Sequence, residues 1–182
     1  TAYDDDGGAD AGAAYVLFLT TDGMGKSAQQ ISNSYGGLSS FYSVGNTDFF
    51  GFSAASANDL NGDGVTDLVV GVSRDDDGGT NTGAVYVLFL QASCPTPAPT
   101  LTPIPSYLPT PAPTANGCVS DGTVASAQKI SNLYGDLPDT LGNVDVFGNS
   151  VCPVDDLDEN GVPDIMVGAS LDDDGGVDAG AV

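Results

Sequence analysis

One acidic loop occurs twice in this chain, and the second copy begins 97 residues after the first. The copies span residues 59–67 and 156–164, each with Asp or Asn at positions 1, 3, 5 and 9 and glycine at position 6. This alternation lets one tight turn direct several hard oxygens at a single point, and Ca²⁺ takes roughly six to eight such ligands. With the main-chain carbonyl at position 7, the predicted metal ligands are Asp59, Asn61, Asp63, Val65 and Asp67 in the first loop and Asp156, Asp158, Asn160, Val162 and Asp164 in the second.

A helical EF-hand has a similar loop, but it needs a bidentate Glu at position 12. Here position 12 is Val70 or Val167. Both valines lie in short apolar runs, 68–70 and 165–167, that predict buried strands. The pattern therefore predicts a Ca²⁺ loop between two strands.

The net charge limits the possible partners. The chain has 25 acidic residues against three basic ones, and its formal net charge is −22. Nucleic acids and anionic membranes are polyanions, so neither is an expected partner. No apolar run approaches the roughly 18 residues that a membrane-spanning helix needs, so membrane insertion is not expected. Two Ca²⁺ ions would offset part of the negative charge, which makes Ca²⁺ the predicted cofactor.

The three cysteines indicate the compartment. Cys94 and Cys118 flank a proline-rich stretch, and we predict a disulfide between them; three free buried thiols are the alternative. Cys152 stands where the earlier repeat has Ala55, and its role stays open. Because disulfides and millimolar Ca²⁺ both occur outside the cell, the predicted location is extracellular or at the cell surface. The chain starts at Thr1 without a signal peptide, so we expect it to be processed or part of something longer.

Self-comparison divides the chain into repeats of 71 residues, and the second copy carries 26 more. An Asp-Asp-Asp-Gly-Gly turn recurs at 4–8, 75–79 and 172–176, and a solvated turn is favoured there over a further Ca²⁺ site.

Eight of the 11 prolines lie between residues 95 and 113, which predicts an extended segment. Its predicted O-glycosylation sites are Thr96, Thr100, Thr102, Ser106, Thr110 and Thr114. A bare spacer or a ligand for a proline-binding domain is the alternative.

Within one repeat the coarse prediction is four short strands. They are expected near 49–54, 67–72 and 83–91, with the fourth near 28–32 and again near 127–131. The strands are rich in β-branched and aromatic residues, and the turns are rich in Gly, Asn and Asp. No segment shows sustained helical periodicity, so the predicted fold class is all-β.

These motifs, taken in order, resemble FG-GAP repeats, the blades of integrin α-subunit-type β-propellers, and in particular a long variant found in microbial surface proteins. The residues that carry the resemblance are Phe50-Gly51, the loop 59–67, Gly71-Val72-Ser73 and 83–87, together with their equivalents in the second copy. The resemblance implies four-stranded antiparallel blades and a structural role for Ca²⁺ at the ten ligands named above. The departures are Ser73 and Ser170, where the family has proline, and the proline-rich insert.

The blade count implied by the resemblance is about two and a half, which is incomplete for a closed propeller. The predicted division is a partial blade at 1–19, a blade with the first Ca²⁺ loop at 20–91, the Pro/Thr-rich insert at 92–122, and a truncated second blade at 123–182. The open sheet faces of such a chain predict self-association or contact with flanking repeats, as a tandem array, a propeller or a head-to-tail filament.

The chain contains no histidine, and nearly all its carboxylates lie in repeated turn or loop positions, so we do not expect an enzyme. The predicted function is that of an extracellular, Ca²⁺-stabilised structural or adhesive repeat protein within a larger surface assembly. It would display a proline-rich segment that carries covalent O-glycans. The alternative is a ligand- or glycan-binding β-propeller module of the lectin or integrin kind.

Overall fold

The computed structural model describes residues 1–93, 118–138, 140–173 and 175–182, and within these ranges it contains strands and one short 3₁₀ helix. This confirms the predicted all-β class. The elements are β1 (Ala14–Leu19), β2 (Gly25–Ile31), η1 (Leu38–Ser40), β3 (Phe50–Ser56), β4 (Leu68–Val72), β5 (Ala84–Leu90), β6 (Val124–Ile130), β7 (Phe147–Pro153) and β8 (Ile165–Ala169).

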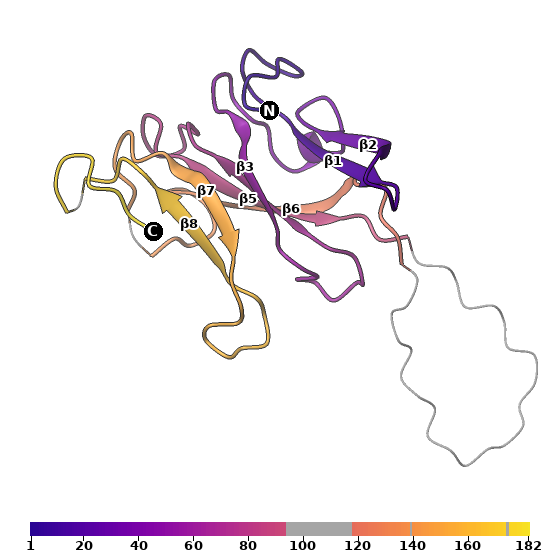
Figure 1. Ribbon diagram of the computed structural model, residues 1–182. Coiled ribbons are helices and arrows are strands. Elements are labelled where there is room, and N and C mark those ends of the chain that lie inside the picture. Colours follow the sequence, from indigo (N-terminus) through magenta and orange to yellow (C-terminus); the bar gives the residue numbers. More distant parts are fainter. Residues whose placement is uncertain (94–117, 139, 174) are drawn as a thin grey trace, which may run out of the picture.

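The strands form three antiparallel sheets (Figure 1). The central blade has the strand order β3-β4-β5-β6. An N-terminal half-blade, β1-β2, lies on one side of it, and a C-terminal half-blade, β7-β8, lies on the other. The four-stranded antiparallel blade is thereby confirmed, and the described strands amount to one complete blade between two halves.

Strand register shows that each half-blade repeats a different half of the central blade. Tyr15 of β1 lies opposite Gln30, as Tyr86 of β5 lies opposite Lys129, and both hairpins are irregular one residue before the end of their first strand. In the same way β7-β8 repeats β3-β4 residue for residue, including the bulge that follows the first phenylalanine. The N-terminal half-blade therefore corresponds to the last two strands of a blade, β5-β6, and the C-terminal half-blade to the first two, β3-β4.

The sheets correct the predicted domain boundaries. Strand β2 pairs with β1, so the division between residues 19 and 20 separates two paired strands. The central blade takes its fourth strand instead from β6, which follows the insert. Backbone hydrogen bonds of 2.8 and 3.0 Å join Ser93 to Val119, so the insert starts and ends within the β5-β6 hairpin. A repeat period fixes the order of strands, but it does not show which copies pair.

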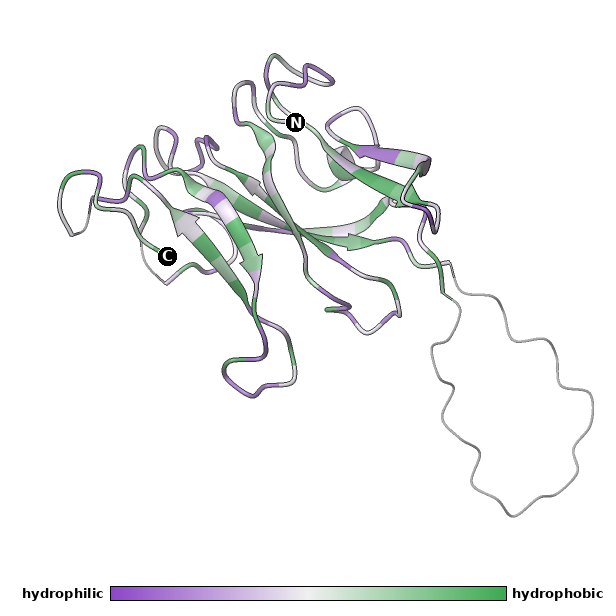
Figure 2. Ribbon diagram, in the orientation of Figure 1, coloured by the Kyte–Doolittle hydropathy of each residue, from purple (hydrophilic) through white to green (hydrophobic). Residues whose placement is uncertain are grey.

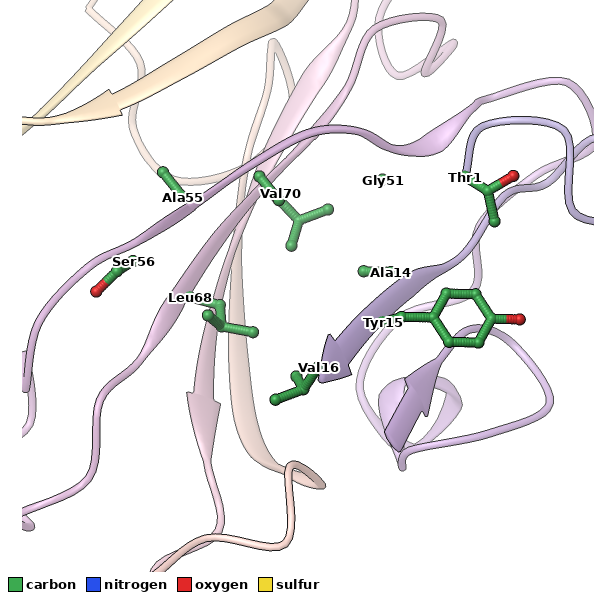
Figure 3. A pocket seen from close by; sticks show the side chains of 10 residues that line it. Thr1, Ala14, Tyr15, Val16, Gly51, Ala55, Ser56, Leu68 and Val70 are labelled. Atoms are coloured by element: carbon green, nitrogen blue, oxygen red, sulfur yellow. The ribbon is translucent and has the colours of Figure 1, made fainter. Parts of the chain in front are cut away.

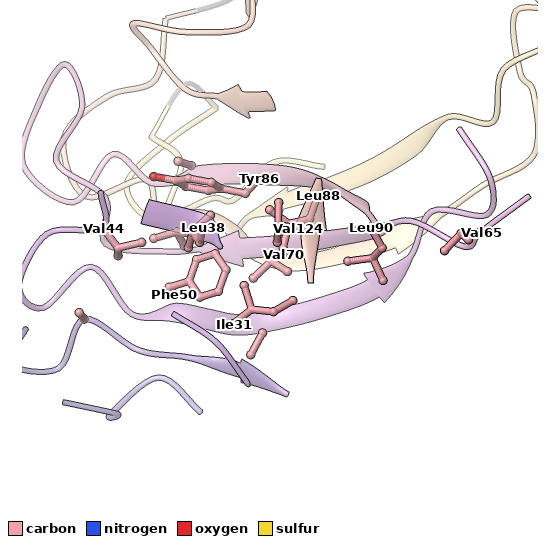
Figure 4. Close-up of a cluster of buried hydrophobic side chains, with 14 residues drawn as sticks. Ile31, Leu38, Val44, Phe50, Val65, Val70, Tyr86, Leu88, Leu90 and Val124 are labelled. Carbon is pink, nitrogen blue, oxygen red and sulfur yellow. The ribbon is translucent and has the colours of Figure 1, made fainter. Parts of the chain in front are cut away.

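Two apolar clusters hold the sheets together, one on each face of the central blade. The first joins Tyr86, Leu88 and Val70 of the central blade to Ile31 of β2 and to Leu38 of η1 (Figure 4). The second packs the side chains of Val69, Val85 and Val87 against β7 and β8. Hydrophobic residues are accordingly concentrated in the central blade and in β1, whereas β2 and most of the turns are hydrophilic (Figure 2). Because the central strands are covered on both faces, β5 is apolar along almost its whole length.

The Phe-Gly pair at the start of β3 and of β7 marks the closest approach between sheets. Gly51 and Gly148 both have positive φ, 80° and 84°. A Cβ atom on Gly51 would lie 2.3 Å from the carbonyl oxygen of Ala13, and one on Gly148 would lie 2.3 Å from that of Ala84. Only glycine allows both this backbone conformation and this contact, so the repeated pair sets the spacing between neighbouring sheets.

We predict that Gly51→Ala destabilises the protein by at least about 2 kcal/mol, because it adds a backbone clash to the strain of a left-handed alanine. Gly23→Ala is the matched control, since Gly23 has φ 86° but a Cβ atom added there would meet nothing within 4 Å. Its cost should be about 1 kcal/mol, from backbone strain alone. Urea denaturation of both variants measures the difference, and equal losses of stability would contradict the role of the contact.

Candidate metal centres

The two acidic loops occupy equivalent places in the fold. The first connects β3 to β4 and the second connects β7 to β8, so each joins the first and second strands of a blade. The strands on either side of each loop match the Ca²⁺ loop between strands that the sequence predicts, in place of the helices of an EF-hand.

Side-chain oxygens in the first loop accept hydrogen bonds from the amides of the loop itself. Asp59 accepts from the amides of Asp63 (3.0 Å) and Gly64 (2.8 Å). Asn61 Oδ1 accepts from Asp63 N at 3.0 Å, and Asp63 Oδ1 accepts from Val65 N at 2.9 Å. This pattern turns the side chains at positions 1, 3 and 5 toward the inside of one turn.

Asp67, at position 9, fixes the loop to the rest of the blade. Its carboxylate is fully buried and accepts from Leu60 N at 3.0 Å and from Leu90 N at 3.1 Å. The first bond closes the loop, and the second ties it to the end of β5. Burial raises the pKa of the Asp67 carboxyl, and the amide of Leu90 opposes that shift.

The second loop repeats the bonds within the first loop and the bond that closes it, but not the tie to β5. Asp156 accepts from Asn160 N at 3.0 Å and from Gly161 N at 2.7 Å, and Asp158 accepts from Asn160 N at 3.1 Å. The remaining two bonds run from Val162 N to Asn160 Oδ1, at 2.7 Å, and from Leu157 N to Asp164 Oδ2, at 2.7 Å. Two different sequences thus adopt one loop geometry.

The second loop brings three carboxylates together. One oxygen from each of Asp156, Asp158 and Asp164 lies within 4.8 Å of the others. Within the described ranges, the ion pairs of the protein involve Lys129, which lies in another part of the fold. Converging oxygens of this kind fit a hard divalent cation such as Ca²⁺. The structure therefore brings together three of the four predicted side chains of this loop, while Asn160 and the carbonyls of Val65 and Val162 stay predicted ligands.

The Asp-Asp-Asp-Gly-Gly turn of the central blade differs from the solvated turn that the sequence predicts. Asp76 Oδ1 does accept a local bond, from Asn81 N at 2.7 Å. Asp75, however, is buried, and its Oδ2 lies 2.6 Å from the Nζ of buried Lys129. The same ammonium group also contacts Asp77. The ammonium group of Lys129, on β6, therefore offsets the negative charge of this turn.

Lys129 is the residue that sequence reasoning missed. The equivalent residue of the N-terminal half-blade is Gln30, whose Nε2 donates to Asp6 at 2.8 Å and to Asp4 at 3.3 Å. Burial alone would lower the pKa of Lys129, but Tyr86, Asp75 and Asp77 raise it above its ordinary value. The available signal was that Lys129 is one of only three basic residues in the chain and replaces a glutamine of the earlier repeat.

Tyr86 and Asp48 complete this buried network. Among the described residues the Tyr86 hydroxyl has no hydrogen-bond partner although it is buried, and the Lys129 Nζ lies 5.2 Å from the centre of its ring. Asp48 accepts from Gly45 N at 2.6 Å. Burial, with a smaller contribution from Asp75, raises the pKa of the Asp48 carboxyl to about 6, although the Gly45 amide and Lys129 oppose the shift.

The cysteine and glycosylation predictions fall largely on undescribed residues. Cys118 is disulfide-bonded, while Cys94 lies outside the described residues, and the pairing stays a prediction. Cys152 is a free, exposed thiol on β7. The predicted glycosylation sites also lie outside the described residues; they are Thr96, Thr100, Thr102, Ser106, Thr110 and Thr114.

We predict that Asp48 makes the protein more stable as the pH falls from 7.5 to 5. Its pKa is about 6 in the folded protein and near 3.8 in the unfolded chain, so the folded state binds the proton more tightly. The contribution should be complete below about pH 4 and lost as the pH rises through 6. Urea denaturation of wild type and Asp48→Asn across this range isolates it. The wild type should gain on the variant as the pH falls, and parallel curves would contradict the assignment.

The comparisons with known proteins agree with this geometry. The family model for the FG-GAP repeat matches residues 50–88, which run from the start of β3 into β5 and include the first acidic loop. None of the curated proteins matches the chain significantly. Within the described ranges, the structure has no helix with the length and apolar character needed to cross a membrane. Residues 50–88 thus match an FG-GAP repeat, and the antiparallel sheets of the described residues are consistent with partial β-propeller blades.

Proposed function

We propose that the chain is an extracellular, Ca²⁺-stabilised structural or adhesive module within a larger assembly of repeats. The observation that carries this proposal is the duplicated acidic loop, with the same internal hydrogen bonds in both copies and three converging carboxylates in the second. FG-GAP repeats are typically extracellular, where Ca²⁺ is abundant enough to occupy such loops.

The proposed ligands are the side chains at positions 1, 3, 5 and 9 of each loop, with the carbonyls of Val65 and Val162. A bound Ca²⁺ would supply positive charge to carboxylates that otherwise repel one another. Because Asp67 also binds the end of β5, an ordered loop would hold the first three strands of the central blade together. The protein's own contribution is orientation, since its amides already fix the acidic side chains.

Apolar surface on the outer half-blades supports a place in a larger assembly. Tyr15, Leu17 and Leu19 of β1 are 47%, 63% and 59% exposed, whereas the equivalent residues of β5, Tyr86, Leu88 and Leu90, are 0%, 0% and 4% exposed. In the central blade these equivalent side chains are covered, because the N-terminal half-blade packs on that face. On β1 they have no such neighbour among the described residues. We propose that further repeats, in flanking sequence or in other copies, cover the open faces.

The insert would be the displayed part of the module. It leaves the blade between β5 and β6, and the Ser93–Val119 hydrogen bonds close its base, so its addition leaves the pairing of those two strands intact. In an extracellular protein a tract of this composition is a typical carrier of O-linked glycans.

We predict that the wild-type protein binds two Ca²⁺ ions and that chelation lowers its melting temperature. A ligand at a hundredfold excess over its dissociation constant stabilises the folded state by about 2.7 kcal/mol per site. Asp156→Asn should remove one site in a calorimetric titration. Glu159→Gln is the matched control, because it removes one charge from the same loop at a position that is not a predicted ligand. Absence of binding to the wild type would contradict the proposal.

We predict that the intact mass of the native protein exceeds that of its polypeptide, 18.2 kDa, by sugar attached within residues 96–114. Proteolysis followed by mass spectrometry of that segment locates the modification. A bare polypeptide mass in material from the native source would contradict glycosylation, while leaving the Ca²⁺ sites untouched.

A further inference from the structure

An apolar groove runs between β1 and the central blade, with a volume of about 350 Å³. Val16 lines it on the side of β1, and Ala54, Leu68 and Val70 line it on the side of β3 and β4. Figure 3 shows Leu68 and Val70 directed from the central blade toward the space beside Val16. The groove lies along the edge of β1 that β2 leaves free.

The opposite face of the central blade shows what fills a groove of this shape. There Val69 of β4 and Val87 of β5 pack against Val151, Ile165 and Val167. By the repeated register, those three residues are the equivalents of Ala54, Leu68 and Val70, and Val87 is the equivalent of Val16. The groove therefore lacks one component, a strand beside β1 with an apolar side chain at the position of Val69.

Strand β8 carries such a side chain. Its Met166 is the equivalent of Val69, but Met166 is 46% exposed and Val69 only 1%. The half-blades are complementary, because β7-β8 repeats the first two strands of a blade and β1-β2 repeats the last two. They lie on opposite sides of the central blade, so β8 cannot reach β1 of its own chain (Figure 1).

We propose that β8 of a second copy of this chain pairs antiparallel with β1 and inserts Met166 into the groove. The register of β4 with β5 fixes the pairing: Met166 lies opposite Val16, Val167 opposite Tyr15, and Gly168 opposite Ala14. This inference rests on the proposed assembly of repeats and specifies its contact. The result is a four-stranded blade made from two chains, β7-β8 of one copy followed by β1-β2 of the next.

The ladder ends at Gly168 because the next position is taken. Thr1 pairs with Ala13, as Val72 pairs with Ala84 in the central blade, and the two hydrogen bonds are 2.6 and 2.9 Å long. Ala169 of the second copy is itself already paired with Ala181 of its own chain, through hydrogen bonds of 2.9 and 2.8 Å. By the register of β4 with β5, Ala181 and Val182 hold the places that Ala13 and Ala14 of the neighbouring copy would take, so these two residues must leave β8 before the copies pair.

Geometry and charge determine how such an assembly behaves. The contact joins the β1 groove of one copy to β8 of another, which are two different surfaces. Each added copy therefore leaves one β1 groove and one β8 uncovered, and the assembly grows as a ring or a filament. Each chain has a net charge of −22, and mutual repulsion opposes association. Association should therefore strengthen as salt or Ca²⁺ is added, because both reduce repulsion between the copies.

A cysteine cross-link tests the register in the full chain. The background is Cys152→Ser, because Cys152 lies opposite Met166 within its own chain and would react with a cysteine there. Val16→Cys combined with Met166→Cys should give, under mild oxidation, a ladder of covalent multiples of the 18.2 kDa chain. The control pairs Val16→Cys with Val167→Cys, whose side chains project from opposite faces of the sheet. Absence of the ladder, or an equal ladder in the control, overturns the inference.

A second measurement avoids cysteine chemistry. Met166→Asp should raise the dissociation constant for self-association at least about tenfold in sedimentation experiments, since it removes an apolar side chain from the interface. Leu133→Asp changes an exposed leucine outside both half-blades and should leave association unchanged. Equal effects of the two changes overturn the inference. Calcium titration reads out the proposed function separately, so a chain that binds Ca²⁺ but stays monomeric loses only this inference.

Discussion

The fold depends on burial of both faces of the central blade. Its strands β4 and β5 are apolar on either side, so a single sheet of this sequence would expose one hydrophobic face to water. The two half-blades remove that cost by packing one on each face. Each sheet is thus stable only as one layer in a stack, which explains why the Phe-Gly contacts and the loop geometry repeat with the sheets.

Charge is the second constraint, and the protein meets it in two ways. In the central blade a buried lysine lies between Asp75 and Asp77, whereas the N-terminal half-blade uses the neutral amide of Gln30 at the same position. Most of the remaining acidic groups accept hydrogen bonds from nearby backbone amides, which carry partial positive charge. Backbone dipoles can therefore order acidic turns in a chain that has very few cations.

Much of this architecture was predictable from spacing alone. The repeat of Asp59 at Asp156 predicted two equivalent loops between strands, because local turn chemistry depends on residues close together in sequence. Strand pairing was less accessible. The predicted division places β2 in the blade at 20–91, but β2 pairs with the preceding strand, because periodic sequences fit several partners equally well. The Lys129–Asp75 pair was also missed, since it joins residues 54 positions apart whose proximity only the completed sheet produces.

The short bridge between Ser93 and Val119 has a consequence for how the chain can vary in length. It closes the β5-β6 hairpin on both sides of the insert, so a change in the number of inserted residues changes the length of a closed loop. The entropy of closing a loop changes slowly, by about 0.6 kcal/mol for each doubling of loop length. At the equivalent position the N-terminal half-blade has only a short turn, residues 20–24. The edge of each blade is thus a place where a segment can lengthen or shorten at almost constant stability.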